Sequence, residues 1–248
     1  MNRLAPPPSV AEDVLRTAVD WAIVSRRSIR AFLPTPVPHE EIESILQVAR
    51  HAASGVNIQP WCVHVVTGPA KDRVSAAILR AHDDPLHREQ LDEPYAYYPK
   101  EWTSPYLERR RKVGWDLYGL LDIPKGDKAR MHAQHARNYR FFDAPVGLFF
   151  TVDQILEQGS FIDYGMFLQS IMVAARARGL DTCPQAAFTL FHRIIERELG
   201  LREQEKLVCG MSLGYADPSR IENSLVSERV PVKSFTRFHV DEPLRTTP

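Results

Sequence analysis

Three arginines and a serine lie within five residues of one another, and together they have the chemistry of an anion site. Arg26, Arg27, Ser28 and Arg30 occupy an irregular stretch that follows a predicted helix. Three cations and a hydroxyl group on one loop can hold a phosphate through charge-assisted hydrogen bonds. A solvated basic turn has the same residue types and is commoner, so this run alone leaves both interpretations open.

A second stretch carries small side chains directly before a predicted strand. Ser54, Gly55 and Asn57 lead into the segment Gln59-Pro60-Trp61. Small side chains allow a flat ring or a sugar chain to approach the backbone closely. The pattern is weak by itself, and we interpret Gln59-Pro60-Trp61 as structural, with Trp61 opening a core strand.

Several well-known catalytic motifs are absent from the sequence. It contains no G-x-S-x-G, H-E-x-x-H, EF-hand or Walker pattern, and no G-x-G-x-x-G dinucleotide motif. His132 and His135 could offer two metal ligands from one helix, but no third ligand is obvious and two solvent-facing histidines are the commoner case. The basic run 109–112 is expected to be solvated helix charge. The sequence therefore predicts no metal ligands.

Composition places the chain among ordinary globular proteins. Its 248 residues fit one large domain or two small ones, and 44% of them are hydrophobic. Lysine plus arginine and aspartate plus glutamate both number 31, so the formal net charge is zero and no global field attracts nucleic acid or an anionic membrane.

Cysteine usage and hydropathy bear on the compartment. Cys62, Cys183 and Cys209 are widely spaced and odd in number, which gives neither a disulfide framework nor a C-x-x-C motif. A reducing cytoplasm is the simplest expectation. No window reaches the ~18 uninterrupted apolar residues of a membrane span, and the N-terminus has no apolar run of signal-peptide length. We expect a soluble, cytoplasmic protein.

Periodicity predicts many helices around few strands. Helical spacing covers residues 9–24, 39–53, 71–82, 105–121, 125–142, 160–178 and 189–199. Strands are expected over 61–67, 146–152 and 207–215, with a short extended piece over 180–183. Ser9 and Glu12 form a predicted capping box, and Gly55 is a candidate C-cap region for the second helix.

Alternation within the last strand predicts its two faces. Leu207, Cys209, Met211 and Leu213 are expected on one face. The other face carries Val208, Gly210, Ser212 and Gly214, whose small side chains permit close approach of another element.

Two segments have no regular pattern. Residues 83–106 interleave prolines with Tyr95, Tyr97, Tyr98 and Trp102, and a long aromatic loop of this kind is typical of a functional or mobile segment. The tail from 219 to 248 is polar and broken by prolines, so it is expected to reach over another surface.

Taken in order along the chain, a set of short anchors resembles the FMN-dependent nitroreductase family. The anchors are Arg26-Arg27-Ser28-Ile29-Arg30 with Ala31-Phe32, Ser54-Gly55, Asn57, Gln59-Pro60-Trp61, Gly179-Leu180 with Cys183-Pro184-Gln185-Ala186, and Arg229-Val230-Pro231. They span residues 26 to 231, and the stretch 163–187 is most similar to the nitrobenzoate-reductase-like branch. Each anchor is weak, but their ordered combination is specific.

The resemblance implies an FMN phosphate site and a site for its ring. Arg26, Ser28 and Arg229 would hold the phosphate, with Arg27 adjacent, and Arg30 would lie at the pyrimidine edge of the ring. The second phosphate cation of the family is not evident, because Ser227 stands two residues before Arg229. The expected ring neighbours are Pro184, Gln185 and Ala186, with a backbone N–H near flavin N5, and Ser54, Gly55 and Asn57 from the other subunit of a homodimer.

The resemblance also implies fold and function. It predicts one α+β domain over residues 1–248, a three-layer α/β/α arrangement with a small, largely antiparallel sheet, an aromatic insert at about 83–125 and an extended tail from about 219. The dimer is expected around the 160–178 helix and the tail, with FMN at the subunit interface.

The implied activity is hydride transfer from NADH or NADPH through flavin N5 to a small nitroaromatic acceptor, by a ping-pong mechanism without a catalytic side chain. Quinone or enone reduction, reductive dehalogenation, a non-catalytic flavin carrier and a metal-dependent hydrolase using His132 and His135 remain as alternatives.

Overall fold

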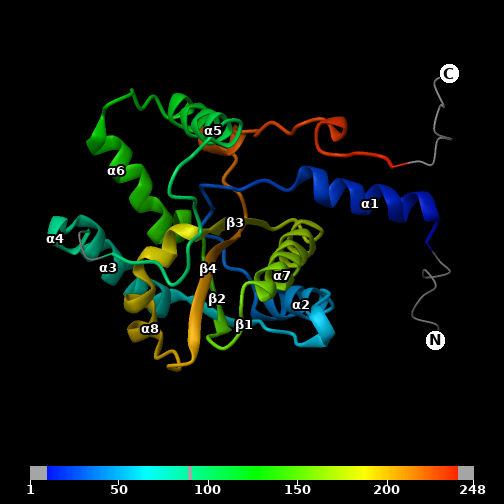
Figure 1. Ribbon diagram of the computed structural model, residues 1–248, viewed down its shortest axis with the longest axis horizontal. Helices are drawn as coiled ribbons and strands as arrows, with labels where there is room; N and C mark the ends of the chain where they lie inside the picture. Colours follow the sequence, from blue (N-terminus) through cyan, green and yellow to red (C-terminus); the bar gives the residue numbers. More distant parts are fainter. Residues whose placement is uncertain (1–9, 89–90, 240–248) are drawn as a thin grey trace, which may run out of the picture.

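The computed structural model describes residues 10–88 and 91–239, and its centre is a four-stranded sheet. The strands are β1 (Cys62–Thr67), β2 (Val146–Asp153), β3 (Asp181–Gln185) and β4 (Glu205–Gly214). They lie in the order β1-β2-β4-β3, and every neighbouring pair is antiparallel (Figure 1). The predicted small, largely antiparallel sheet is confirmed.

Eight α-helices lie in the described parts of the chain outside the sheet. They are α1 (Glu12–Ser25), α2 (His39–Ala49), α3 (Gly68–Asp83), α4 (Pro85–Arg88), α5 (Tyr106–Leu120), α6 (Lys128–Ala136), α7 (Gly159–Arg176) and α8 (His192–Leu199). Short 3-10 segments lie between these elements and after β4, namely η1 (Gly55–Asn57), η2 (Arg137–Asp143), η3 (Ala186–Phe191), η4 (Ile221–Ser224) and η5 (Val232–Ser234). None of these helices is long and apolar enough to cross a membrane.

The sheet separates two apolar clusters, which gives three layers. One cluster joins strand residues such as Leu148 and Phe150 to α2 and α7. The other joins Phe149 of the same strand to α3, α8 and the 3-10 segments η2 and η3. Figure 1 shows α2 and α7 on one side of the sheet and α3 and α8 on the other. Successive side chains of β2 therefore pack alternately on the two faces of the sheet, as expected where helices cover both faces.

Two glycines on the central strands make room for aromatic rings. A Cβ atom added at Gly147 would lie 2.5 Å from the ring of Phe141, and one added at Gly210 would lie 2.4 Å from the ring of Phe188. Both rings are fully buried. The close approach predicted for the small-residue face of the last strand is confirmed at Gly210.

A β-bulge changes the predicted facing of the last strand. Phe150 pairs with Cys209 and Thr151 pairs with Leu207, so Val208 is an extra residue opposite no partner. Leu207 therefore packs in the cluster under α3 and α8, whereas Val208 and Cys209 pack under α7. The prediction that Leu207 shares a face with Cys209 is wrong, because the bulge shifts the alternation by one residue.

Three helix boundaries also differ from the predictions. The helix expected over 125–142 is α6 followed by η2, because Phe141 and Phe142 adopt positive φ angles of 54° and 53°. The second helix ends at Ala49, and Gly55 opens η1 instead of capping that helix. The first helix starts at Glu12 with no side-chain cap, and Ser9 of the predicted capping box lies outside the described residues.

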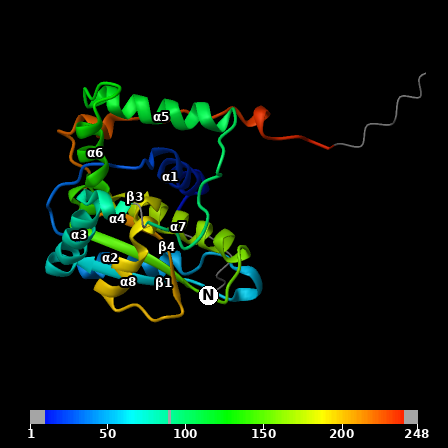
Figure 2. The same cartoon turned by 60° about the vertical axis from the view of Figure 1, so that its left-hand side comes forward.

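Helix α5 and the C-terminal segment lie away from the sheet (Figure 2). Lys112 of α5 pairs with Glu228 at 3.3 Å, so the tail runs beside this helix. Beyond η5 the side chains of Phe235 and Phe238 are exposed. The tail thus covers α5 first and then extends from the body of the molecule.

Candidate functional site

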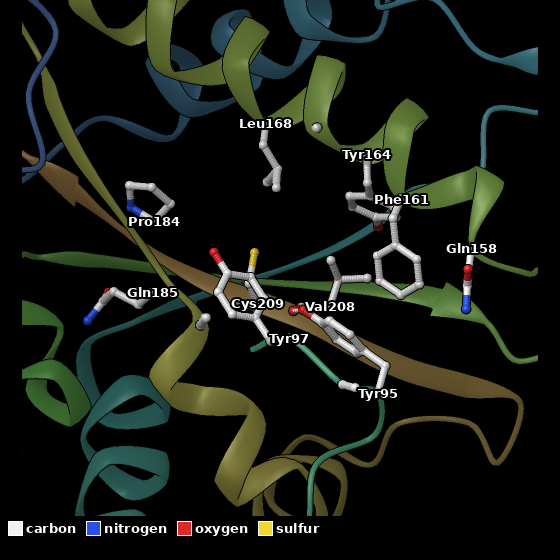
Figure 3. A pocket seen from close by; sticks show the side chains of 13 residues that line it. Tyr95, Tyr97, Gln158, Phe161, Tyr164, Leu168, Pro184, Gln185, Val208 and Cys209 are labelled. Carbon is white, nitrogen blue, oxygen red and sulfur yellow. Dashed lines mark hydrogen bonds between the residues drawn. The ribbon is translucent and has the colours of Figure 1, made fainter. Parts of the chain in front are cut away.

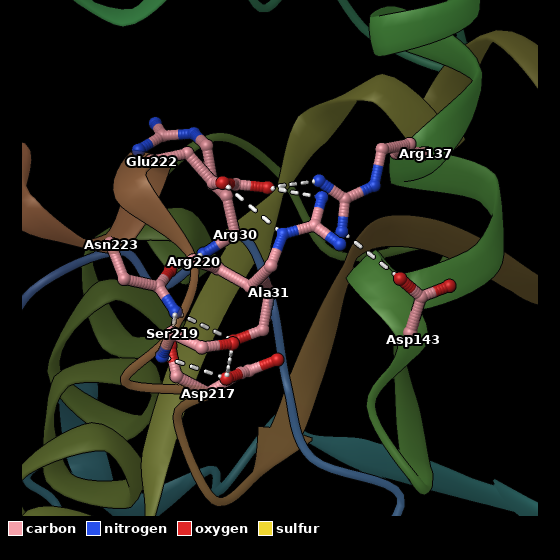
Figure 4. Close-up of polar contacts among 9 residues, drawn as sticks. All are labelled: Arg30, Ala31, Arg137, Asp143, Asp217, Ser219, Arg220, Glu222 and Asn223. Atoms are coloured by element: carbon pink, nitrogen blue, oxygen red, sulfur yellow. Dashed lines mark hydrogen bonds and ion pairs between the residues drawn. The ribbon is translucent and has the colours of Figure 1, made fainter. Parts of the chain in front are cut away.

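The basic loop, residues 26–30, lies against β3 at the edge of the sheet. Ser28 forms a parallel bridge with Thr182, and the Ile29 N–H donates to the Thr182 carbonyl at 3.1 Å. Asn223 of η4 fixes the following residues, because its Oδ1 accepts from the Arg30 N–H at 2.9 Å and its Nδ2 donates to the Ala31 carbonyl at 2.8 Å (Figure 4). Backbone pairing therefore holds the loop in one conformation.

A buried carboxylate anchors the tail next to this loop. Glu222 is ion-paired with Arg137 at 2.5 Å and with Arg220 at 2.9 Å, and Arg137 also reaches Asp143 at 3.0 Å (Figure 4). Burial alone would raise the pKa of Glu222, but hydrogen bonds from its own backbone, Arg220 and Arg137 outweigh burial and lower it. This network fixes the start of the tail that carries Arg229.

The loop and the tail enclose a cavity of about 570 Å³. Five residues predicted from the sequence line it together, namely Arg26, Arg27, Ser28, Arg30 and Arg229. Apolar side chains from α1, α5 and the tail complete the wall. The structure therefore brings together residues that are about two hundred positions apart in the sequence.

The charges of this cavity are unbalanced. None of the ion pairs between described residues includes Arg26 or Arg229. Burial lowers the pKa of Arg26, and the positive charge of Arg229 lowers it further. Arg229 donates to the Ser227 hydroxyl at 2.7 Å. Two neighbouring guanidinium groups without a carboxylate partner form a site suited to an anion with several acceptor oxygens.

A second cavity of about 580 Å³ lies at the end of β3 (Figure 3). Pro184, Gln185 and Ala186 line one end, and Val208 and Cys209 of β4 form part of its wall. Aromatic side chains line much of the remainder, from the loop before α5 and from α7; they are Tyr95, Tyr97, Phe161 and Tyr164. The cavity is mostly apolar and suits a flat ring system.

The predicted aromatic loop forms one wall of this cavity. The Tyr95 hydroxyl donates to the Val208 carbonyl at 2.5 Å, and the Tyr95 ring lies 4.6 Å from that of Phe161 between centroids. Val208 is the residue that the bulge leaves without a Cα partner on β2. Sequence reasoning identified this loop by its aromatic content, but it missed Phe161 and Tyr164, which lie within an ordinary core-spaced helix.

The side-chain amide of Gln185 is held by the protein. Its Nε2 donates to the Asn138 carbonyl at 2.8 Å, and its Oε1 accepts from the Ser212 hydroxyl at 2.7 Å. Both ends of the amide therefore have partners within the protein, which fixes this residue in the wall of the cavity.

Ser54, Gly55 and Asn57 line neither cavity. They lie in or beside η1, on the outer side of α7, where the Gly55 N–H donates to Asp163 Oδ1 at 3.2 Å. The neighbouring Val56 side chain is 97% exposed. Within one chain these residues do not join the other predicted site residues. Trp61, in contrast, stacks on Phe167 of α7 at 4.6 Å between centroids, which fits the structural role expected of it.

Comparisons with known proteins agree with this arrangement. Residues 23–215 match the model of the nitroreductase family. A 4-nitrobenzoate reductase of Pseudomonas putida is 45% identical over 219 residues, which cover 88% of this chain and 94% of that protein. The chain therefore belongs to the nitroreductase family.

Solved structures give the same result. The FMN- and NADPH-dependent nitroreductase NfnB from Sphingopyxis superposes with a TM-score of 0.86 at 36% identity, covering 90% of this chain and 99% of that one. NfnB from Mycobacterium smegmatis, solved in complex with NADPH, gives 0.85 at 32% identity, covering 91% and 100%.

Proposed function

We propose that the protein is an FMN-dependent nitroreductase that takes electrons from NADH or NADPH and reduces nitroaromatic compounds. The observation that carries this proposal is the pair of cavities along β3, one cationic and one apolar. Thr182, which pairs with the basic loop, is two residues from Pro184, which lines the apolar cavity. A ligand with a phosphate at one end and a flat ring at the other fits this order.

The residues of the cationic cavity fit the FMN phosphate. Arg26 and Arg229 supply guanidinium groups that lack a carboxylate partner among the described residues, and Ser28 supplies a hydroxyl. Arg27 lines the same cavity. A phosphate would balance the charges of the two guanidinium groups and accept hydrogen bonds from both. Arg30 also lines the cationic cavity, and we propose that it meets the pyrimidine edge of the ring.

The residues of the apolar cavity fit the ring. Pro184, Gln185 and Ala186 would lie beside it and present their backbone. We further propose that Ser54, Gly55 and Asn57 complete the site from the second subunit of a homodimer. Gly55 and Asn57 are exposed and Ser54 is half-buried beside α7, which supports this assignment. A monomer in size-exclusion chromatography with multi-angle light scattering that retains FMN tightly would contradict the shared site.

FMN held in this way would supply hydride transfer: in the reaction that we propose, N5 would take hydride from NAD(P)H, and the reduced flavin would then reduce the nitroaromatic acceptor in a ping-pong cycle. The side chains of this chain bind, orient and exclude water. Burial raises the pKa of the Cys209 thiol to about 12 and also raises the pKa values of Tyr95 and Tyr164. These groups stay protonated near neutral pH, which supports a mechanism without a catalytic base.

The three cysteines are free thiols, which supports a cytoplasmic location.

The activity is tested by identifying the flavin released from the purified protein and by measuring turnover of 4-nitrobenzoate and nitrobenzene with each nicotinamide. One FMN per chain and nitro-dependent oxidation of NADH or NADPH are expected. Flavin that no nicotinamide reduces would indicate a carrier, and turnover of quinones or enones without nitroarenes would indicate another acceptor.

A further inference from the structure

A cysteine, a histidine and a glutamate converge at one end of the sheet, outside both cavities. Cys62 and His64 are two residues apart on β1 and share a face, and Glu205 begins β4 on the other side of β2. The Cys62 Sγ atom is 3.7 Å from His64 Nε2, and His64 Nε2 is 2.7 Å from Glu205 Oε2. All three ligand atoms lie within 4.8 Å of one another.

The glutamate of this cluster is buried and held in place. Its side chain is 5% exposed. Arg202 donates to Oε1 at 2.7 Å, and the Thr151 hydroxyl donates to Oε2 at 2.7 Å. Hydrogen bonds of this kind orient a carboxylate and define which oxygen faces the other ligands. Oε2, the atom nearest His64, therefore points into the cluster.

We propose that Cys62, His64 and Glu205 form a binding site for a thiophilic divalent cation of the Zn²⁺ type. Zn–S bonds of about 2.3 Å and Zn–N and Zn–O bonds of about 2.0 Å place tetrahedral ligand atoms roughly 3.3 to 3.6 Å apart. The sulfur–nitrogen distance of 3.7 Å exceeds this spacing by only about 0.1 Å. The nitrogen–oxygen pair is now a hydrogen bond and needs to open by less than about 1 Å.

The ligand set defines which cations fit and what binding releases. A thiolate with an imidazole favours zinc and other thiophilic ions over Mg²⁺ and Ca²⁺, which prefer oxygen. Binding releases the Cys62 thiol proton to solvent, and the N–H that His64 directs at Glu205 moves from Nε2 to Nδ1, so that Nε2 can bind the cation. The imidazole is 26% exposed, which leaves the fourth position to water. The sequence indicated no such site, because Glu205 is more than 140 residues from its partners.

The test measures zinc bound by the purified, flavin-loaded protein in equilibrium dialysis against chelator-buffered Zn²⁺. Wild type is expected to retain one zinc per chain. Cys62→Ser and His64→Ala are expected to weaken binding by at least about 100-fold, since even outer-shell partners are typically worth 10- to 100-fold. His51→Ala is the matched control, because His51 is exposed and lies outside the cluster.

A second group of possible ligands gives the decisive alternative. Ligand atoms of His82, Asp83 and His132 also lie within 4.8 Å of one another. Zinc that is lost in His132→Ala and kept in His64→Ala would overturn the proposal, as would a wild-type protein that retains none. Flavin content and the unfolding temperature show whether each variant is folded, and Glu205→Gln, which keeps the side-chain shape, replaces any variant that is not.

Discussion

Replacing Arg229 by alanine is expected to weaken FMN binding and leave riboflavin binding nearly unchanged. Arg229 shares the cationic cavity with Arg26 and Ser28, and its charge already lowers the pKa of Arg26. A phosphate between the two guanidinium groups gains a charge-assisted hydrogen bond from each. Such a bond is worth about 1.5–3 kcal/mol, which corresponds to roughly a 10- to 150-fold change in affinity.

Flavin fluorescence titrations of the apoprotein measure this effect with both ligands. Riboflavin lacks the phosphate, so the ratio of the two affinities isolates the phosphate contribution from any general loosening of the site. Lys233→Ala is a matched control, because it removes one positive charge from the same tail but not from the cavity. An equal loss for FMN and riboflavin, or unchanged FMN affinity, would refute the assignment of Arg229 to the phosphate.

Three further substitutions test the scaffold. Gly210→Ala places a Cβ atom 2.4 Å from the buried Phe188 ring and is expected to cost about 1–3 kcal/mol in urea unfolding. The Cys62 N–H donates to the Tyr164 hydroxyl at 2.9 Å, and Tyr164→Phe removes this acceptor. This substitution is expected to lower the free energy of unfolding by about 1–3 kcal/mol. In Glu205, burial raises the pKa, but hydrogen bonds outweigh it and lower the pKa from 4.5 to about 2. Wild type therefore loses stability as pH falls from 4.5 towards 2, and Glu205→Gln is expected to show a shallower loss over that range.

The glycine and glutamate predictions each have a clear contrary result. Gly119→Ala is the control for the glycine substitution, because nothing lies within 4 Å of its added Cβ atom, and it is expected to be neutral or stabilising by up to about 1 kcal/mol. A Gly210→Ala protein as stable as this control would show that the Phe188 ring can move aside. An unchanged acid slope in Glu205→Gln would show that the hydrogen-bonded carboxylate does not control acid stability.

The cationic cavity shows what local sequence supports and what it does not. Arg26, Ser28 and Arg30 have the residue types and spacing of an anion-binding run, although the run alone left a solvated basic turn as the commoner interpretation. Arg229 carries no such local signal, since an isolated arginine in a polar tail is ordinary. Its placement depends on the buried ion pairs of Glu222, which join segments far apart in the chain. In the sequence, only the resemblance to the nitroreductase family connected Arg229 with the basic loop.

The predictions for the 125–142 helix and for the last strand are wrong for conformational reasons. Periodicity carried the predicted helix through Phe142 because the apolar spacing continues, whereas the backbone turns into the left-handed region at Phe141 to bring its ring over Gly147. The bulge at Val208 depends on the pairing of β4 with β2, which alternation within one strand does not reveal. Tertiary packing therefore determines both where this helix ends and where the bulge lies.

The most direct test of the central proposal separates the two half-reactions in time. The purified protein is reduced anaerobically with NADPH or NADH, freed of nicotinamide by gel filtration, and then mixed with 4-nitrobenzoate while the flavin absorbance is followed. We predict bleaching in the first step and full reoxidation in the second, with one nitro compound per flavin reduced by two electrons to the nitroso level; the hydroxylamine requires the two electrons of a second reduced flavin. A flavin that bleaches but is not reoxidised by any nitroarene would contradict the proposed function.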